Sequence, residues 1–399
     1  MENSNIDVYD CNIKTLTPIH IGSGKNYLAA EYISVKAKNK STKKLVNLIR
    51  RVSFDKYYQS LSEEDQYRFI ESASNPNFKL SEFASTIKKD FRRYDCINKS
   101  DDIRNEIVEH IKTNDESYIP GSSLKGAIKT ALLYNSFDYS DKNNIERLFR
   151  TSNRGDYIPR FENFTSTFFS SSQKRGKSAQ FDISRFLQFS DSTTFERPDI
   201  HGIVSIMGKK NSYDGLEYYQ RGRGQNIVES FLETIPMKTN LKSRISINYD
   251  SNIYNNDKLP SYVNLNLKSR ENFIDMDTIK KCIYEFSKDI IEYEIEFLDK
   301  YGYGKGLEDV NLSLAKNYIA LKKINKIKSP IIKLGAGSGF LAMTIGIKIK
   351  HYDSELFERI RNSLKGKNYY YEFPKSRKII KKSKMPLGWV KLDITKREV

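Results

Sequence analysis

A short glycine-rich segment near the N-terminus holds residues suited to binding an anionic backbone. It is "HIGSGK", from His20 to Lys25. Gly22 and Gly24 leave room for a ribose-phosphate chain to approach closely. Ser23 can hydrogen-bond to such a chain, and Lys25 can neutralise a phosphate. A plain turn between strands explains the same glycines. His20 would suit a general base, but no acid–base partner stands at a recognisable spacing, which favours a packed, hydrogen-bonded histidine.

A second anion-binding candidate is the start of the helix predicted in "YIPGSSLKGAIKTALL", residues 118–133. The sequence places a turn at Pro120 and Gly121 and an N-cap at Ser122 or Ser123. The apolar residues that share one helical face are Leu124, Ala127, Ile128, Ala131 and Leu132. Unpaired N–H groups and the helix dipole favour a phosphate at such a start, with Lys125 beside it. An ordinary capped helix with solvated lysines is the alternative.

A third glycine-rich segment, "LGAGSG", supplies Gly335, Gly337, Ser338 and Gly339. A strand followed by such a loop is typical of class I methyltransferases, which bind S-adenosylmethionine. However, only 60 residues follow Gly339, too few for the βα units such a domain needs. A nucleotide-hydrolysing P-loop is not supported either, because Lys25 precedes Asn26 and the GxxxxGK spacing is missing.

The C-terminal segment "KNYYYEFPKSRKIIKKSKMP" combines aromatic and basic side chains, among them Arg377 and Lys378. Stacking rings beside cations are what single-stranded nucleic acid binding requires. A strand edge whose lysines discourage aggregation is the alternative interpretation.

Metal and disulfide chemistry find little support in the sequence. The cysteines and histidines are scattered, at Cys11, Cys96, Cys282, His20, His110, His201 and His351. No spacing matches a zinc site or a disulfide framework. We therefore expect no metal site and no cofactor.

The 399-residue chain is strongly basic, with 67 Lys and Arg against 50 Asp and Glu and a net charge of +17. This excess, with 12% aromatic residues, favours a nucleic acid partner, although compositional bias would also produce it. No apolar run of membrane-spanning length and no signal-peptide pattern occurs, so we expect a cytoplasmic protein without membrane attachment.

The elements that must position these segments alternate irregularly. The sequence predicts strands in 5–15 and 243–249 and helices around 62–73, 102–112, 277–301 and 353–366. It also predicts a strand that carries Ile345, Ile347 and Ile349 on one face. We expect residues 136–230, which are rich in polar residues, to form an elaborated or partly mobile insertion. The absence of a regular βα repeat favours an α+β fold. The predicted division is 1–235 and 236–399.

Five segments together resemble a known family. They are "TPIHIGSG", "YIPGSSLKGAIKTALL", "FDISRFLQFSDS", "LGAGSGFLAMT" and "MPLGWVKL". In this order they resemble the repeat-associated mysterious proteins (RAMPs) of CRISPR systems. The set is most similar to the subunit that caps the type III-A (Csm) effector complex.

The resemblance implies two ferredoxin-like halves, related to RNA-recognition motifs, that bind CRISPR RNA through its backbone. It implies partnership with CRISPR RNA, target RNA and other Csm subunits, at the filament end that holds the 3′ portion of the guide. The residues it places along the RNA path are His20 to Lys25, Gly121 to Lys125 and Gly335 to Gly339. Asp191 matches a family motif for which we expect a structural role.

One departure from the family bears on catalysis. Related backbone subunits cleave target RNA with an aspartate after the first glycine motif, whereas this chain offers Glu31 and no aspartate there. We therefore expect a non-catalytic RNA-binding subunit that assists guide maturation in antiviral defence. The alternatives are a metal-independent RAMP endoribonuclease that processes guide RNA, and an interaction module with an incidentally basic surface.

Overall fold

The computed structural model describes thirteen segments of the chain. They are residues 6–38, 44–75, 78–84, 87–104, 106–137, 149–151, 157–159, 183–210, 215–221, 226–248, 275–302, 307–365 and 370–398. Much of the predicted insertion at 136–230 therefore lies outside the described residues, and so does the start of the aromatic C-terminal segment, residues 366–369.

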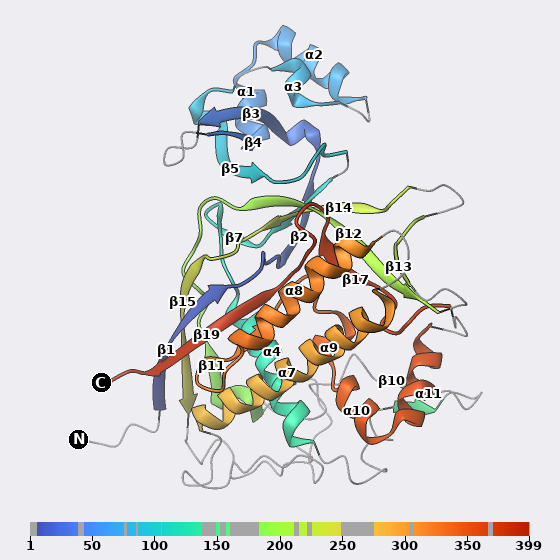
Figure 1. Cartoon of the computed structure of the whole chain (residues 1–399). Coiled ribbons are helices and arrows are strands. Elements are labelled where there is room, and N and C mark those ends of the chain that lie inside the picture. Colours follow the sequence, from blue (N-terminus) through green and yellow to red (C-terminus); the bar gives the residue numbers. More distant parts are fainter. Residues whose placement is uncertain are drawn as a thin grey trace.

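A five-stranded antiparallel sheet brings the first and last strands of the chain together (Figure 1). In spatial order its strands are β11 (Leu187–Phe189), β15 (Asn240–Asn248), β1 (Ile6–Thr15), β19 (Trp389–Lys396) and β16 (Ile331–Lys333). In β1, Cys11, Ile13 and Thr15 are buried and the residues between them are exposed, because alternate side chains of a strand point to opposite faces. The strands predicted at 5–15 and 243–249 are confirmed.

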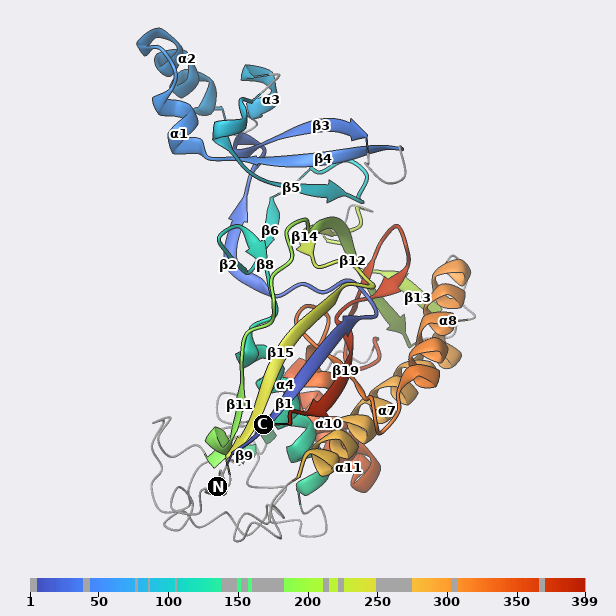
Figure 2. The same cartoon turned by 90° about the vertical axis from the view of Figure 1, so that its left-hand side faces the viewer.

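Helices pack on one face of this sheet (Figure 2). They are α4 (Gly121–Ser136), α7 (Met276–Tyr301), α8 (Glu308–Ile324), α9 (Gly339–Met343), α10 (Gly346–Tyr352) and α11 (Ser354–Lys365). The long helix predicted at 277–301 is α7, which buries one face that includes Ile279, Ile283 and Phe286. It ends at Gly302, whose N–H donates to the carbonyl of Leu298 at 2.7 Å.

A ten-stranded mixed sheet lies above the five-stranded one in Figure 1. Its main path is β2 (Gly22–Tyr27), β6 (Ile107–His110), β14 (Glu229–Thr234), β12 (Asp199–Lys209), β5 (Arg92–Asn98), β4 (Leu45–Val52) and β3 (Tyr32–Lys38). Strands β13 (Gly215–Tyr218) and β17 (Arg377–Ile380) also pair with β12, and β18 (Met385–Pro386) pairs with β17. Two short hairpins are β7 (Lys112–Thr113) with β8 (Glu116–Ser117), and β9 (Phe149–Thr151) with β10 (Tyr157–Pro159).

Strands β3 to β5 and three helices form an upper lobe with its own core (Figure 1). The helices are α1 (Phe54–Gln59), α2 (Glu63–Ala73) and α3 (Leu80–Phe83). Phe69 is buried at the centre of this core, in ring contact with Tyr57 and Phe78. The helix predicted at 62–73 is α2, and the side chain of Ser62 caps it by accepting from Asp65 N.

Two sequence predictions of secondary structure are wrong. The described residues of 102–112 contain strand β6 and no helix, because Phe231 of β14 pairs with Ile107 and the Glu233 side chain accepts from His110 N. The apolar spacing in this stretch fits a helix, but tertiary pairing overrides it. Residues 345–349 belong to α10 and its N-cap rather than to a strand. The alternation is misleading here because Gly346, which would lie on the opposite face of such a strand, is buried as well.

The division of the chain near residue 235 stays a prediction. The five-stranded sheet takes strands from both sides of that point, since β1 and β11 pair with β15. The predicted α+β class is confirmed.

Candidate nucleic-acid interface

The first glycine segment enters β2 from a buried histidine. His20 is 5% exposed, and its Nδ1 lies 2.6 Å from the backbone carbonyl of Glu233. A carbonyl only accepts, so Nδ1 carries the proton and donates it. The remaining nitrogen, Nε2, is directed towards Gly22, where an added Cβ would lie 3.4 Å away. Gly22, Gly24 and Lys25 are exposed and Ser23 is half-buried, so this segment presents most of its length at the surface.

The third glycine-rich segment, Leu334 to Gly339, packs directly against the first. Ala336 N donates to the carbonyl of His20 at 2.8 Å. Gly335 has a φ of +66°, and a Cβ there would lie 2.1 Å from the same carbonyl oxygen. Only glycine allows this close approach. Gly388 completes the junction, because its N–H donates to the carbonyl of Pro18 and its carbonyl accepts from Leu334 N.

The third glycine-rich segment, Leu334 to Gly339, has the backbone conformation of an anion-binding nest. Gly337 has a φ of +87° and Gly339 a φ of +56°, whereas Ser338 between them is right-handed helical. Successive N–H groups of such a pair converge on one point and favour an anion there. Gly335 and Gly339 are exposed, whereas Ser338 is buried and its N–H donates to the carbonyl of Gly335 at 3.2 Å. Ser338 therefore stabilises the loop conformation and is not itself presented at the surface.

The start of α4 differs from the sequence prediction. Pro120 is the N-cap, so Ser122 and Ser123 lie inside the first turn and neither is the cap. Gly121 is buried against the carbonyl of Phe189, and its N–H donates to the carboxylate of Asp191 at 2.8 Å. A carboxylate at a helix start takes the place an external anion would occupy. The structural role expected for Asp191 is thus explained.

Of the remaining members of this motif, Ser122 is exposed, and Ser123 and Lys125 are half-buried. The α4 helix itself follows the predicted pattern, with Leu124, Ile128, Ala131 and Leu132 buried and Ala127 half-buried.

Two neighbouring basic residues of β17 have opposite surroundings. Arg377 is only 9% exposed in its side chain, donates to Glu294 at 2.6 Å and packs 3.3 Å above the ring centre of Phe297. Its guanidinium therefore serves the core and is not presented to a ligand. Lys378 points the other way and is exposed.

The charge of Lys378 acts on the first glycine segment. Burial lowers the pKa of His20 below its usual value, and the cationic side chains of Lys378 and Lys112 lower it further. Lys25 and Lys378 form no ion pair within the described part of the chain. We call the exposed residues Gly22, Gly24, Lys25, Gly335, Gly339 and Lys378, together with half-buried Ser23, the glycine surface.

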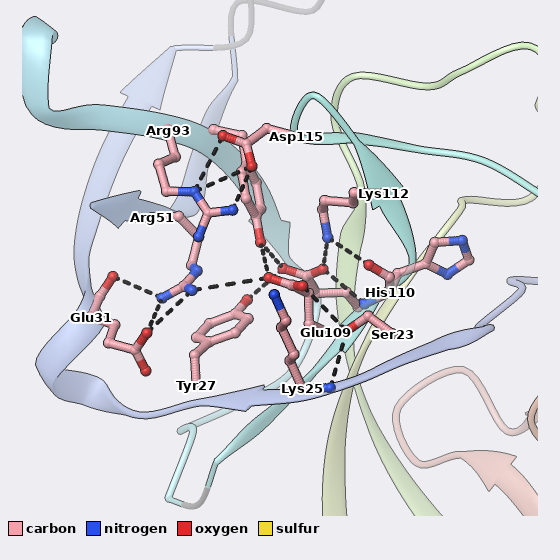
Figure 3. Close-up of polar contacts among 12 residues, drawn as sticks. Ser23, Lys25, Tyr27, Glu31, Arg51, Arg93, Glu109, His110, Lys112 and Asp115 are labelled. Carbon is pink, nitrogen blue, oxygen red and sulfur yellow. Dashed lines mark hydrogen bonds and ion pairs between the residues drawn. The ribbon is translucent and has the colours of Figure 1, made fainter. Parts of the chain in front are cut away.

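A buried polar network lies next to Ser23 and Lys25 of the glycine surface (Figure 3). The Glu233 carboxylate pairs with Lys112 and accepts from Tyr27 at 2.7 Å and from Tyr94 at 2.9 Å. Burial alone would raise the pKa of Glu233, but Lys112 and the hydrogen bonds from Tyr27 and His110 N outweigh it and lower the pKa below its usual value. Loss of either member of such a buried pair costs about 3–5 kcal/mol, because the other charge is left uncompensated.

The same network fixes the surface residues of β2. Ser23 Oγ donates to Glu109 at 3.2 Å and accepts from Lys25 N at 3.1 Å. Arg51 lies 4.0 Å from Glu109 and stacks over the ring of Tyr27 (Figure 3). Glu233 and Lys112 were not among the site residues predicted from the sequence. The signal was present, since "FLETIP" places a glutamate inside an apolar strand.

His110 links the first glycine segment to the turn before α4. Its Nδ1 accepts from Ile21 N at 3.1 Å, and its Nε2 donates to the carbonyl of Tyr118 at 3.0 Å. Burial lowers the pKa of His110 to about 3. This histidine is therefore neutral near pH 7 and acts as a structural connector.

Glu31, the carboxylate that the sequence offers where related subunits have a catalytic aspartate, is already engaged. Glu31 is engaged by Arg51, which donates to its carboxylate at 3.3 Å, and by Leu28 N at 3.1 Å. Among the residues the structure describes, no three His, Cys, Asp or Glu side chains gather as metal ligands would. No helix in the described segments is long and apolar enough to span a membrane.

The fold and the interlocked glycine segments define a class of protein. The chain belongs to the RAMP superfamily, whose family model matches residues 12–341. A curated relative is the CRISPR system Cms protein Csm5 of Methanocaldococcus jannaschii, which is 24% identical over 416 residues. The match covers 95% of this chain and 87% of the relative.

Solved structures share the fold. A chain in the cryo-EM structure of a Csm–crRNA–target RNA ternary complex of a type III-A CRISPR–Cas system superposes with a TM-score of 0.65 and 19% identity. The match covers 96% of this chain and 100% of the chain in the complex. The crystal structure of T. onnurineus Csm5 gives a TM-score of 0.61 at 19% identity over 95% and 99% of the two chains. The expected RAMP fold is thus confirmed.

Proposed function

We propose that this chain is an RNA-binding subunit of a type III-A CRISPR effector complex. Membership of the RAMP superfamily and similarity to Csm5 proteins support the assignment of this chain to such a complex. On this proposal the chain caps the filament near the 3′ portion of the CRISPR RNA, contacts other Csm subunits and target RNA, and assists guide maturation in antiviral defence.

The observation that carries RNA binding is the glycine surface. Three segments far apart in sequence meet at the carbonyls of Pro18 and His20, and they leave exposed glycines beside Lys25 and Lys378. Glycines let a sugar-phosphate backbone approach, and contacts to that backbone bind without selecting bases. Neutralisation of phosphates by the two lysines adds a salt-dependent affinity.

Binding without cleavage is the form of the proposal that the site chemistry favours. The carboxylate of Glu31 is held by Arg51 and Leu28 N, and both ring nitrogens of His110 bond to backbone groups. A second candidate, metal-independent guide cleavage, rests on His20, whose unprotonated Nε2 faces exposed Gly22. A general base in that position would suit attack by a 2′-hydroxyl.

The test is the affinity of the purified chain for single-stranded RNA between 50 and 200 mM salt, measured by fluorescence anisotropy. We expect affinity to fall steeply with salt, and Lys25→Glu with Lys378→Glu to weaken it and flatten the slope. The matched control is Lys56→Glu with Lys88→Glu, two exposed lysines of the upper lobe. Salt-independent or absent binding would refute the proposal. Cleavage of RNA in EDTA that His20→Ala abolishes would support the nuclease instead.

A further inference from the structure

A lysine-rich groove lies away from the glycine surface, between α7, the end of α8 and the turn before β16. Its volume is about 610 Å³. The residues that matter for its chemistry are Tyr284, Lys288, Lys322, Lys326, Ile327 and Lys328. Helices α7 and α8 run side by side here (Figure 1), so two helices and one turn build the walls.

The floor of the groove is fixed by a buried asparagine. Asn325 Nδ2 donates to the carbonyl of Tyr284 at 3.0 Å, and its Oδ1 accepts from Ile331 N at 3.2 Å. Ser329 N closes the turn by donating to the carbonyl of Lys326 at 3.1 Å. The groove is therefore preformed, which lowers the entropic cost of binding a ligand there.

The groove carries more lysines than its ion pairs and helix end account for. Lys322 pairs with Glu292 at 3.1 Å and sits in the last turn of α8, where a cation stabilises the helix dipole. Lys288, Lys326 and Lys328 lie outside that turn and form no ion pair in the part of the chain that the structure describes. Three ammonium groups thus converge on one groove without an internal partner.

We propose that this groove is a second docking site for single-stranded RNA, distinct from the glycine surface and resting on the proposed function. The lysines match phosphates, while the ring of Tyr284 and Ile327, which is 48% exposed, offer apolar surface for bases. Gly335 follows Ser329 by six positions, so the turn at one end of the groove lies at most about 20 Å from the glycine surface. One RNA strand that touches both gains affinity through effective concentration.

The test compares two charge-matched variants of the full chain on a labelled, unstructured 20-nucleotide RNA. The groove variant carries Lys288→Glu, Lys326→Glu and Lys328→Glu. The control carries Lys56→Glu, Lys88→Glu and Lys89→Glu, exposed residues of the upper lobe. We expect the slope of log affinity on log salt to fall by about 2 in the groove variant, since each lost phosphate contact removes about 0.7. We expect a much smaller fall in the control.

Equal slopes for both variants would overturn the inference. If the Lys25→Glu and Lys378→Glu variant loses RNA while the groove variant retains wild-type binding, the second site is wrong and the proposed function stands. If the groove variant binds RNA normally but loses an acidic peptide such as polyglutamate, the groove serves a protein partner instead. Tyr284→Ala is expected to weaken RNA binding at least about fivefold, and Tyr284→Phe to preserve it, because the ring remains. Equal loss in both would exclude stacking.

Discussion

His110 has a bonding pattern that only a neutral imidazole satisfies. Its Nδ1 must accept from Ile21 N while its Nε2 donates to Tyr118, so a second proton would break the first of these bonds. That bond joins the first glycine segment to the strand beneath it. Acid should therefore loosen the glycine surface and the fold together.

The pH dependence follows from the sign of the pKa change. Burial lowers the pKa of His110 from 6.5 to about 3, so the unfolded chain takes up the proton first as pH falls. The stability that this residue contributes is present above pH 6.5 and is lost as pH falls towards 3, at about 1.4 kcal/mol per pH unit. We expect His110→Gln to have a shallower decline in the urea midpoint between pH 7 and 5.

The matched control for this prediction is His351→Gln, because His351 is exposed. It should keep the wild-type slope. Measurement of the slope rather than of the absolute stability separates the titration from any packing defect that the substitution causes. An unchanged slope in His110→Gln would show that other groups carry the acid sensitivity.

The glycine loops depend on close backbone contact between elements. We expect Gly335→Ala to destabilise the fold by about 1–3 kcal/mol and to lower RNA affinity, because its φ of +66° and the carbonyl of His20 leave no place for a Cβ. Urea unfolding and RNA titration measure the two effects.

Gly126→Ala is the control for the loop substitution. Gly126 lies on the exposed side of α4, and an added Cβ there meets nothing within 4 Å. We expect alanine to stabilise this helix position by about 0.5–1 kcal/mol and to leave RNA binding unchanged. Similar losses in both variants would mean that glycine content, and not the contact with His20, determines the result.

The last strand of the chain, β19, is an inner strand of the five-stranded sheet. Strand β19 lies between β1 and β16, and it buries Trp389, Val390 and Leu392. Removal of residues 389–399 would leave the facing edges of β1 and β16 without ladder hydrogen bonds and would expose the core beneath them. We expect this truncation to abolish cooperative unfolding by circular dichroism, whereas removal of 397–399 should retain it. A cooperative transition in the longer truncation would contradict the central place of β19.

The sequence pattern alone predicted those elements whose buried residues recur with a single period, either helical or alternating. Helix α7 and strands β1 and β15 appear where the sequence predicts them, because each has one buried face and clear ends. The glycine segments were also identified from residue types alone. Where the apolar spacing fits both a helix and a strand, the prediction was wrong. Residues 102–112 are the example, because the pairing around His110 requires a strand.

The assembly of the interface needed the folded chain. No local pattern indicates that Ala336 bonds to His20, that Asp191 occupies the start of α4, or that Glu233 pairs with Lys112. Arg377 and Lys378 show the reason most directly. They are adjacent and chemically alike, yet one is buried beside Glu294 and the other faces solvent. Side chains of a strand alternate between its faces, and only packing against α7 determines which face becomes the interior.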